Sequence, residues 1–539
     1  MNNTLKEILV GLIFIVLVSL AAHLIFSWIG FVPSDDGFML AYSRRILDGQ
    51  IPFKDFLSAQ NVGTPILWTP FVYFGGDYTF WITRFVVWFE FASIAWIWTS
   101  IISKAFSKKN ISHISKIVLA LITFFFTAHS FPPMVWYTID GLFFYSIAIV
   151  LCRQKNKYVK MLGYVLVGVT YLIKQNFIFL LPATIILLGD WKLKRYWLSL
   201  FAPLALFYGF FFPTAGLYAT ISQTTSRTEF VQAAIKAFTS KFTFPWGIIF
   251  GFTGSLMLQK KHFAKVNFGF LLLLCPVLYS VFYFHNSGKL IYDASFFLFG
   301  TVLGITIYFL RKKMYKIVSV MLLGVMAAWT VAISGGYNTP VFASGILFLY
   351  IFFTLRYFLN LDSDFGQGLS KILIVILILI FPVTLYSFFL LRIYSIYSEV
   401  RPAMQLTYSV AKVLPGGKNI FTSKEVYDVL SDLQSAEKIA EKERKPYAIL
   451  PGDAALWVKS KQANPLMMDY PFIFNNQKAL IEPLVNNIKN EKGKIIIILG
   501  KGCLTQPVDN SEMGAFPICL IPQKYYQKFS ETKYFFLYK

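Results

Sequence analysis

The sequence predicts a polytopic α-helical membrane protein of about thirteen transmembrane helices, followed by a small C-terminal α/β soluble domain. Of 539 residues, 56% are hydrophobic and only 14% are charged, which leaves too little polar surface to cover a soluble protein of this size. Long apolar runs alternate with short basic clusters, as in multi-span proteins. Charges and turn-forming pairs return only in residues 392–539.

The first apolar run, residues 8–29, is long enough to cross a bilayer as a helix, and no small-residue cleavage site follows it, which favours an anchor over a removable signal peptide. Two of the later runs, 160–174 and 177–189, are short for a full crossing, and they are either extended by flanking residues or re-entrant, so the count can shift by two. The remaining predicted spans are 79–101, 117–132, 136–152, 197–212, 245–258, 266–284, 294–310, 317–334, 341–358 and 371–391.

Basic residues fall in every second loop, which is the pattern of orientation signals. With the N-terminus inside, an odd number of spans places residues 392–539 outside. We therefore expect a multi-pass inner (plasma) membrane protein whose C-terminal domain is periplasmic, and we attribute the net charge of +23 to orientation and not to nucleic-acid binding. The clusters are Lys104, Lys108, Lys109 and Lys116; Arg153, Lys155, Lys157 and Lys160; Lys192, Lys194 and Arg195; Lys260, Lys261 and Lys265; and Arg311, Lys312, Lys313 and Lys316.

The predicted domains are residues 1–391 in the membrane and 392–539 outside it. In the latter, Ser423 to Glu443 has the pattern of a capped helix, and Asn476 to Asn490 forms a second helix. The runs "YAILPG" and "KIIIILG" are typical of buried parallel strands. These features predict a small α/β layer domain.

Four cysteines and five histidines give no metal-binding motif, and Gly-rich phosphate loops and GxSxG are also lacking. We expect no cofactor, and a divalent cation has no support in the sequence. Cys503 and Cys519 share the outer domain, where an oxidising compartment permits a disulfide, but the sequence leaves the bond open.

The first outer loop, residues 30–78, carries two adjacent acids directly after the first span. Asp35 and Asp36 begin a predicted amphipathic helix from about Asp36 to Asp48, with Gly49 as its stop, lying on the outer membrane surface. One explanation is structural: Ser34 or Asp35 caps the helix and Asp36 favours its positive end. The other is functional, because acids at a membrane rim are costly and are retained for chemistry.

The segment "DDGFMLAYSRRILDGQIPFKDF" resembles the first outer loop of GT-C membrane glycosyltransferases of the protein O-mannosyltransferase and lipid A aminoarabinose-transferase type. That loop has an Asp followed by Asp or Glu and Gly, and then Gly-x-x-Pro-aromatic-x-Asp-Phe, which Gly49, Pro52, Phe53, Asp55 and Phe56 match. "MVWYTIDGLFFYSIAIVL" places Asp140 where the family has a second acid. "GVTYLIKQNFIFLLP", "SGGYNTPVFASG" and "YAILPGDAALWVKSKQANPL" are also similar to segments of bacterial members.

The resemblance implies transfer of a sugar from a polyprenyl monophosphate to a hydroxyl of a lipid, glycan or protein, with membrane lipids as the other partner. Asp35, the first acid of the pair, is the expected general base, and Asp36 and Asp140 have supporting roles. One departure concerns the donor: aminoarabinose transferases have a Lys-Pro-Pro that contacts the donor phosphate, whereas "AQNVGTPILW" has no lysine. This departure weakens transfer of the particular substrate and leaves the chemistry in place.

The leaving phosphate needs fixed cations, and few outer basic residues are available. Lys174 and Lys289 are equally explained as phosphate ligands or as side chains that snorkel to the interface, and Arg45 and Arg401 as weaker ligands or as contacts to lipid headgroups. Asp140 is also explained as a helix cap. Tyr337 and Asn338 either line the sugar pocket or form a turn.

Two other classes fit the hydropathy. A secondary transporter has many spans and buried acids, but it is expected to show internal repeats and broken or charged helices at the bilayer midplane. A flippase, an O-antigen ligase or a noncatalytic glycan-assembly scaffold also fits, yet does not require paired acids in the first outer loop.

Overall fold

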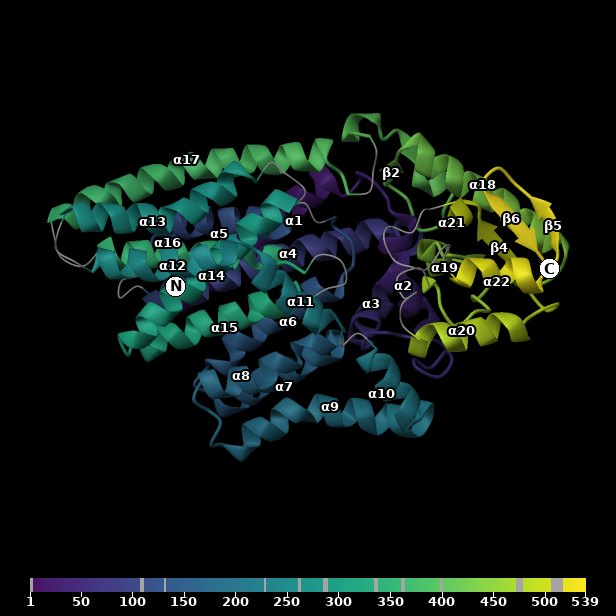
Figure 1. Ribbon diagram of the computed structural model, residues 1–539, viewed down its shortest axis with the longest axis horizontal. Coiled ribbons are helices and arrows are strands. Elements are labelled where there is room, and N and C mark those ends of the chain that lie inside the picture. Colours follow the sequence, from purple (N-terminus) through teal and green to yellow (C-terminus); the bar gives the residue numbers. More distant parts are fainter. Residues whose placement is uncertain are drawn as a thin grey trace.

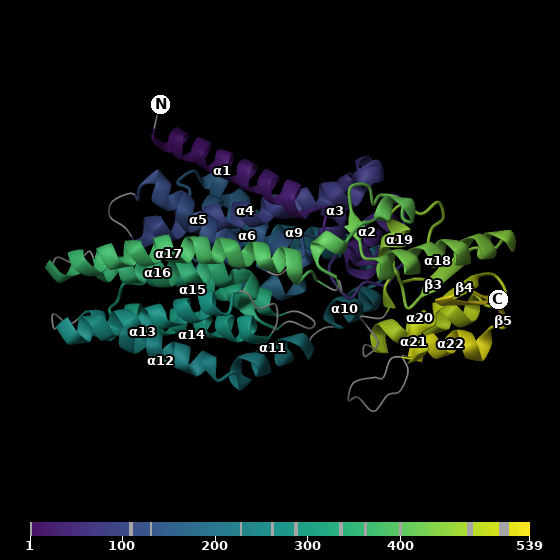
Figure 2. The same ribbon diagram turned by 90° about the horizontal axis from the view of Figure 1, so that it is seen from above.

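The protein consists of a long helical body with an α/β domain at one end (Figure 1). The computed structural model describes residues 3–106, 111–129, 132–226, 229–259, 263–284, 289–333, 338–359, 364–397, 401–471, 478–505 and 517–539. Seen from above, α1, α4 and α5 lie on one side of the body and α12, α13 and α14 on the other (Figure 2). The short helices α2 (Pro33–Leu47) and α3 (Gly63–Phe74) lie where the body meets the α/β domain (Figures 1 and 2).

All thirteen predicted apolar segments fall on helices of the body. Their bounds are α1 (Asn3–Phe26), α4 (Thr79–Phe106), α5 (His113–Ala128), α6 (Tyr137–Cys152), α7 (Lys157–Ile173), η2 (Gln175–Phe179) with α8 (Leu180–Leu187), α9 (Lys194–Ala215), α12 (Thr243–Leu258), α13 (Phe263–Phe282), α14 (Lys289–Arg311), α15 (Tyr315–Ala332), η3 (Pro340–Ala343) with α16 (Ser344–Leu359), and α17 (Asp364–Tyr394).

Eight helical segments within the described ranges are long and apolar enough to cross a membrane. Segments at α5, α6, α8 with η2, and α12 are apolar but shorter, and α7 has 17 residues. The helical membrane architecture is therefore confirmed, and a full crossing by each of the five shorter segments stays a prediction. The eight are Leu5–Phe26, Gly76–Phe106, Lys194–Ala215, Lys265–Phe282, Ile291–Arg311, Tyr315–Ala332, Pro340–Leu359 and Lys371–Tyr394.

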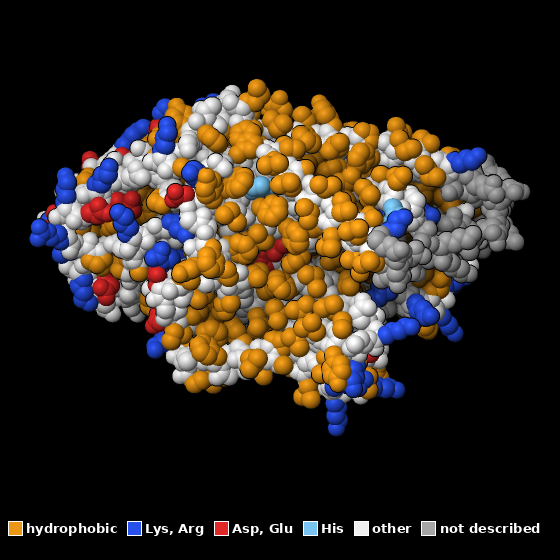
Figure 3. All heavy atoms as spheres, turned by 180° about the vertical axis from the view of Figure 1, so that it is seen from behind, with side chains coloured by type: hydrophobic (Ala, Val, Ile, Leu, Met, Phe, Trp, Pro, Cys, Tyr) orange, Lys and Arg blue, Asp and Glu red, His pale blue; other side chains and the backbone are white. Residues whose placement is uncertain are grey.

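The surface of the body is apolar over its middle. On the face seen from behind, hydrophobic side chains form a broad belt, and Lys and Arg gather toward both ends (Figure 3). Large apolar side chains of α1 and α17 are exposed, among them Leu17, Leu24, Ile378 and Leu379. An exposed apolar area of this extent needs a nonaqueous surrounding, so the belt is the surface that faces lipid.

Helix α2 (Pro33–Leu47) differs from the predicted surface helix. Pro33 takes the first helical position and Val32 is the N-cap residue, so neither Ser34 nor Asp35 caps the helix. Gly37 packs against the backbone of Ala455 so closely that an added Cβ would lie 1.9 Å from the Ala455 nitrogen. The helix is buried between the body and the α/β domain, because its apolar residues are covered by protein on both sides. Its predicted stop at Gly49 is confirmed, with φ at +81°.

The chain also contains α3 (Gly63–Phe74), η1 (Gly76–Tyr78), α10 (Leu217–Thr225) and α11 (Glu229–Ser240). The turn that carries the Gly-x-x-Pro motif is held by its own residues: Asp55 accepts a hydrogen bond from the Ile51 N–H at 2.7 Å. Phe53, at φ +68°, packs on Phe207 and Phe211 of α9. The motif residues therefore attach this turn to the body.

The C-terminal domain is built on a four-stranded sheet of order β3-β4-β6-β5. The two predicted strands, β3 (Tyr447–Leu450) and β4 (Ile496–Gly500), are parallel and buried, as expected. The sequence prediction missed the antiparallel hairpin β5 (Lys528–Glu531) and β6 (Phe535–Tyr538) that completes the sheet. The predicted helices are α18 (Lys424–Lys442), with Ser423 as its N-cap, and α20 (Lys478–Asn490).

The domain also contains η4 (Ala403–Gln405), β1 (Tyr408–Ser409), η5 (Val410–Lys412), β2 (Phe421–Thr422), α19 (Ala454–Val458), α21 (Gly502–Thr505) and α22 (Pro517–Tyr525). Cys503 and Cys519 form a disulfide, with their Cα atoms 6.2 Å apart. The bond links α21 to α22, and it answers the question that the sequence left open. The division of the chain at residue 391 stays a prediction.

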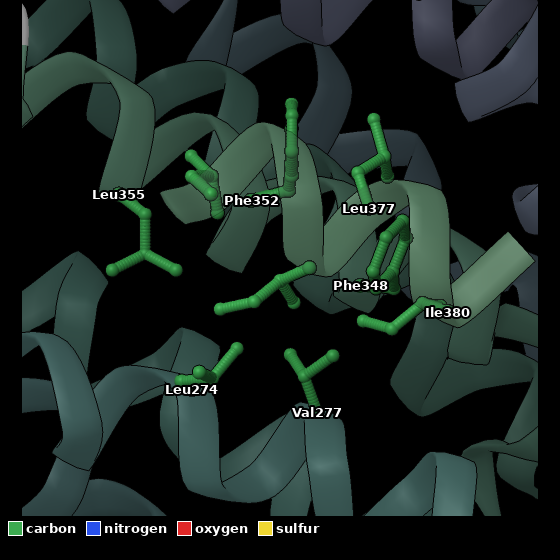
Figure 4. Close-up of a pocket in the computed structure, with 9 residues that line it drawn as sticks. Leu274, Val277, Phe348, Phe352, Leu355, Leu377 and Ile380 are labelled. Carbon is green, nitrogen blue, oxygen red and sulfur yellow. The ribbon is translucent and has the colours of Figure 1, made fainter. Parts of the chain in front are cut away.

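A small apolar pocket lies between α13, α16 and α17 (Figure 4). Its volume is about 10 Å³, and Leu274, Phe348 and Ile380 are among the side chains that line it. This volume is at the lower limit for one water molecule, and the pocket has no polar group, so it is a packing gap and not a substrate site.

Candidate functional site

The two adjacent acids of α2 have different surroundings. Asp36 is buried, and its carboxylate accepts hydrogen bonds from Arg84 Nη2 at 3.0 and 3.1 Å and from the Val32 N–H at 2.9 Å. Arg84 also donates to the carbonyls of Ser27 and Gly30, both at 2.8 Å. Asp36 therefore joins the end of α1, the start of α2 and α4 through a buried ion pair.

Asp35 is half-buried, and its Oδ2 accepts a hydrogen bond from the Tyr397 hydroxyl at 2.9 Å. Across the described part of the chain, no basic side chain forms an ion pair with it. Burial raises the pKa of Asp35, and the neighbouring charge of Asp36 adds to this, whereas the hydrogen bond from Tyr397 opposes it. A carboxylate with these properties is a better proton acceptor than a solvated one.

Two groups of the C-terminal domain lie at the same place. Tyr470 hydrogen-bonds to Ser34, and burial together with the charges of Asp35 and Asp453 raises the pKa of its hydroxyl. Its ring lies 5.9 Å from that of Phe38, centroid to centroid. The first turn of α2 is therefore covered by residues from the far end of the chain.

Asp140 lies in the first turn of α6 and is 0% exposed. Its Oδ2 accepts hydrogen bonds from Thr64 Oγ1 at 2.8 Å and from Trp68 Nε1 at 3.0 Å. The N-cap residue of α6 is Trp136, so the helix-cap explanation is wrong: Asp140 binds α3 and does not cap its own helix. Glu90 of α4 lies beside it.

Lys174 is 3% exposed, which contradicts the explanation as a side chain that snorkels to the interface. Its Nζ donates to Thr138 Oγ1 at 2.9 Å and lies 5.1 Å from the centre of the Tyr137 ring. Tyr137 stacks on Trp136 at 5.0 Å, and the Trp136 ring lies 6.3 Å from that of Phe38. A continuous series of aromatic rings thus joins the surroundings of Lys174 to α2, one turn after Asp35.

The segment "AQNVGTPILW" of the first loop is packed against the end of α7 and the turn that follows it. Asn61 donates to the Tyr171 carbonyl at 2.6 Å, and Gln175 donates to the Ala59 carbonyl at 3.0 Å. Within the ranges that the structure describes, neither amide atom of Gln60 has a hydrogen-bond partner. Lys174 directly precedes Gln175, so the contact of Gln175 with the Ala59 carbonyl brings the Lys174 backbone close to this segment.

The two predicted arginines are engaged elsewhere. Arg45 is 4% exposed and forms a bidentate pair with Asp469, at 2.6 and 2.8 Å, so the predicted contact with lipid headgroups is wrong. Arg401 is exposed and pairs with Glu425 at 3.0 Å. Each guanidinium group is therefore paired with one carboxylate of the C-terminal domain.

Three of the predicted substrate-binding residues lie at the start of α14 or in the segment after α15. Lys289 is the first residue of α14, and its side chain lies outside the described residues, as does Tyr337. Asn338 has φ at +42°, a left-handed backbone that asparagine tolerates better than most residues. This conformation favours the turn explanation for Asn338.

The site therefore includes Asp35, its partner Tyr397 and the neighbouring Tyr470, on which Asp453 also acts. Aromatic rings connect it to the surroundings of Lys174. Sequence reasoning missed Arg84, Tyr397, Tyr470, Asp453 and Glu90. Only Asp453 had a usable signal: it follows "LPG" at the end of a predicted parallel strand, where α/β domains gather their sites.

The fold and the site define a helical membrane protein whose extramembrane α/β domain covers an acidic site at the end of the helical body. No protein-family model matches the chain, and no curated protein matches it.

Two solved structures are similar to it over nearly the whole length. ArnT from Cupriavidus metallidurans bound to undecaprenyl phosphate is 12% identical, with 98% of this chain and 97% of that chain covered and a TM-score of 0.43. The apo state of the same protein is 10% identical, with the same coverage and a TM-score of 0.37. Likeness at this level assigns neither family nor ligand, so the function is argued from the residues.

Proposed function

We propose that the protein is a membrane glycosyltransferase that transfers a sugar from a polyprenyl monophosphate to an acceptor hydroxyl at the outer side of an inner (plasma) membrane. The observation that carries the proposal is the state of Asp35: a half-buried carboxylate of raised pKa, with no ion-pair partner among the residues described, at the end of an apolar helical body. The resemblance of the loop around it to the GT-C first outer loop supports the same chemistry.

The acceptor oxygen attacks the anomeric carbon while the bond from that carbon to the phosphate oxygen breaks. Asp35 takes the acceptor proton as the new bond forms, and the polyprenyl phosphate leaves with the bonding electron pair. A single displacement of this kind inverts the anomeric centre. General-base assistance is worth about 10²- to 10⁴-fold in rate.

The other expected residues have graded roles in this proposal. Lys174 is buried and joined by aromatic rings to α2, and it stabilises the charge that grows on the leaving phosphate. Asp36 holds the helix that carries Asp35, and Asp140 anchors α3 to α6. Lys289 and Tyr337 stay predictions, and Arg45 and Arg401 are not proposed as ligands. The acceptor is a lipid, glycan or protein.

The test is transfer of a radiolabelled sugar from an extracted polyprenyl phosphate pool by the purified protein, with the product identified by mass spectrometry. The wild-type protein is expected to form a covalent sugar-acceptor product. Asp35→Asn is expected to lose turnover by about 10²-fold or more while it still binds the donor. A transporter, flippase or scaffold forms no covalent sugar-acceptor product. If the wild-type protein forms no such product while the donor stays intact, the proposal is refuted.

A further inference from the structure

The loop that carries Asp453 is pressed against the first turns of α2. On one side of it, a Cβ added to Gly452 would lie 2.5 Å from the Asp469 carbonyl oxygen and 3.1 Å from the Tyr470 Cα. On its other side, Ala455 makes the backbone contact with Gly37. Asp453 is therefore held between two tight backbone contacts, next to the turn that carries Asp35.

The Asp453 carboxylate has no structural task. It directly precedes α19, where an aspartate usually caps the helix, yet its side chain makes no capping hydrogen bond. Among the described residues it also enters no ion pair and no other side-chain hydrogen bond. Burial raises the pKa of Asp453 to about 6, because a carboxylate that loses solvent is harder to ionise.

The two arginines of α2, and the arginine of α4 that pairs with this helix, are each engaged by a carboxylate: Arg45 binds Asp469, Arg44 binds Asp48, and Arg84 binds Asp36. These three cations are therefore already neutralised and do not favour an anionic ligand at the first turns of α2. The charges of Asp35 and Asp453 both raise the pKa of the Tyr470 hydroxyl. No direct hydrogen bond joins the two carboxylates in the described structure. Two carboxylates beside a phenol suit a ligand that presents several O–H donors, whereas a phosphate there would be repelled.

We propose that Asp453 binds the acceptor, accepting a hydrogen bond from a hydroxyl near the one that Asp35 deprotonates. The C-terminal domain then forms one wall of the acceptor site, and the acceptor is hydroxyl-rich and carries no phosphate at this position. This inference rests on the proposed function, and it assigns the acceptor side of the reaction to the extramembrane domain.

The experiment compares the full-length wild type with Asp453→Asn and Asp453→Ser. The labelled polyprenyl-phosphate sugar is kept saturating, and the membrane extract that supports wild-type transfer is titrated as acceptor. Because a hydrogen bond to a charged group is lost, the apparent KM for acceptor is expected to rise about 10-fold or more. The KM for donor, and the slow hydrolysis of donor by water, are expected to stay within about 2-fold of wild type, since neither uses the acceptor wall.

Asp428→Asn is the matched control, because this acid of the same domain pairs on the surface with Lys424. An unchanged acceptor KM in both Asp453 variants overturns the inference, as does an equal rise of both KM values. Thermal unfolding of each variant identifies loss of fold, which would lower the active fraction and leave KM unchanged. If the proposed function itself is wrong, the wild-type protein forms no sugar-acceptor product. This outcome differs from a failure of the inference, in which the wild type forms product and the Asp453 variants keep its acceptor KM.

Discussion

At the residue scale, the structure divides two adjacent carboxylates by their partners. The Asp36 carboxylate accepts hydrogen bonds from Arg84 and from the Val32 N–H. The Asp35 carboxylate accepts one hydrogen bond, from the neutral hydroxyl of Tyr397. Removing one partner of a buried ion pair leaves the other charge unpaired. Removing an unpaired, half-buried carboxylate has no such cost.

We therefore expect opposite effects of the two amide substitutions. Asp36→Asn is expected to lower the free energy of unfolding by about 3–5 kcal/mol, because Arg84 keeps its charge in a buried place. Asp35→Asn is expected to leave the melting temperature unchanged or higher, since burial raises the pKa of Asp35 and its ionised form therefore costs stability at neutral pH. Thermal unfolding in detergent measures both, and equal destabilisation by the two variants contradicts the division.

The pH dependence of transfer follows from the same carboxylate. A base must be ionised, so kcat/KM is expected to fall as the pH is lowered through the raised pKa of Asp35. Tyr397→Phe removes the hydrogen bond that lowers this pKa, so the acidic limb is expected to move to higher pH. Transfer rates measured between mildly acidic and neutral pH test the shift. If the acidic limb of the Tyr397→Phe profile moves to lower pH or does not move, the assignment of Asp35 as the general base is contradicted.

At the element scale, α2 connects the two parts of the molecule. Its Gly37 contacts Ala455 through backbone, and its Arg45 reaches Asp469 and the Leu466 carbonyl. The Arg45 guanidinium also lies 5.6 Å from the centre of the Phe56 ring. The helix that carries Asp35 therefore has its position set by the C-terminal domain as much as by the helical body.

Loss of the interdomain ion pair is expected to loosen this connection. Arg45→Met leaves the Asp469 carboxylate buried without its cation, which costs about 3–5 kcal/mol. Limited proteolysis is expected to cut the C-terminal domain faster in this variant. The control is Arg44→Met, because Arg44 forms an exposed pair with Asp48 on the same helix and its loss costs about 0.5 kcal/mol. Equal cleavage rates of the two variants contradict the interdomain role.

At the scale of the whole molecule, an apolar belt separates the α/β domain, where acidic and basic side chains mix, from the opposite end of the body, where Lys and Arg gather (Figure 3). If basic loops stay inside, then the α/β domain and Asp35 lie outside. A lipid-borne sugar donor and the proposed base then meet at the same face of the membrane.

The orientation is tested with a membrane-impermeant thiol reagent on intact cells. Lys438→Cys, exposed on α18, is expected to be labelled, and Lys155→Cys, exposed between α6 and α7, is expected to react only after the membrane is opened. Both substitutions are made in a chain with Cys152 and Cys275 replaced by serine, because these are the free cysteines. Labelling of Lys155→Cys in intact cells reverses the proposed orientation.

Much of the architecture was predictable because apolar periodicity and basic clusters are local properties of the chain. The thirteen apolar segments fall on helices, and β3, β4, α18 and α20 lie where their patterns place them. The hairpin of β5 and β6 was not predicted, since its residues follow no strong alternation. In the first outer loop, the sequence indicated Asp35 and Asp36 together, and it had no means to separate them.

By itself, the sequence determined a multi-helix membrane body, a small α/β domain and a helix of paired acids after the first apolar run. Only the tertiary structure decided that Arg84 neutralises Asp36, that Asp469 engages Arg45, and that Tyr397 and Tyr470 lie at the turn of Asp35, with Asp453 acting on the same Tyr470. The physical reason is that hydropathy and helix stops act over a few residues. The environment of a carboxylate depends on burial and on charges brought from hundreds of residues away.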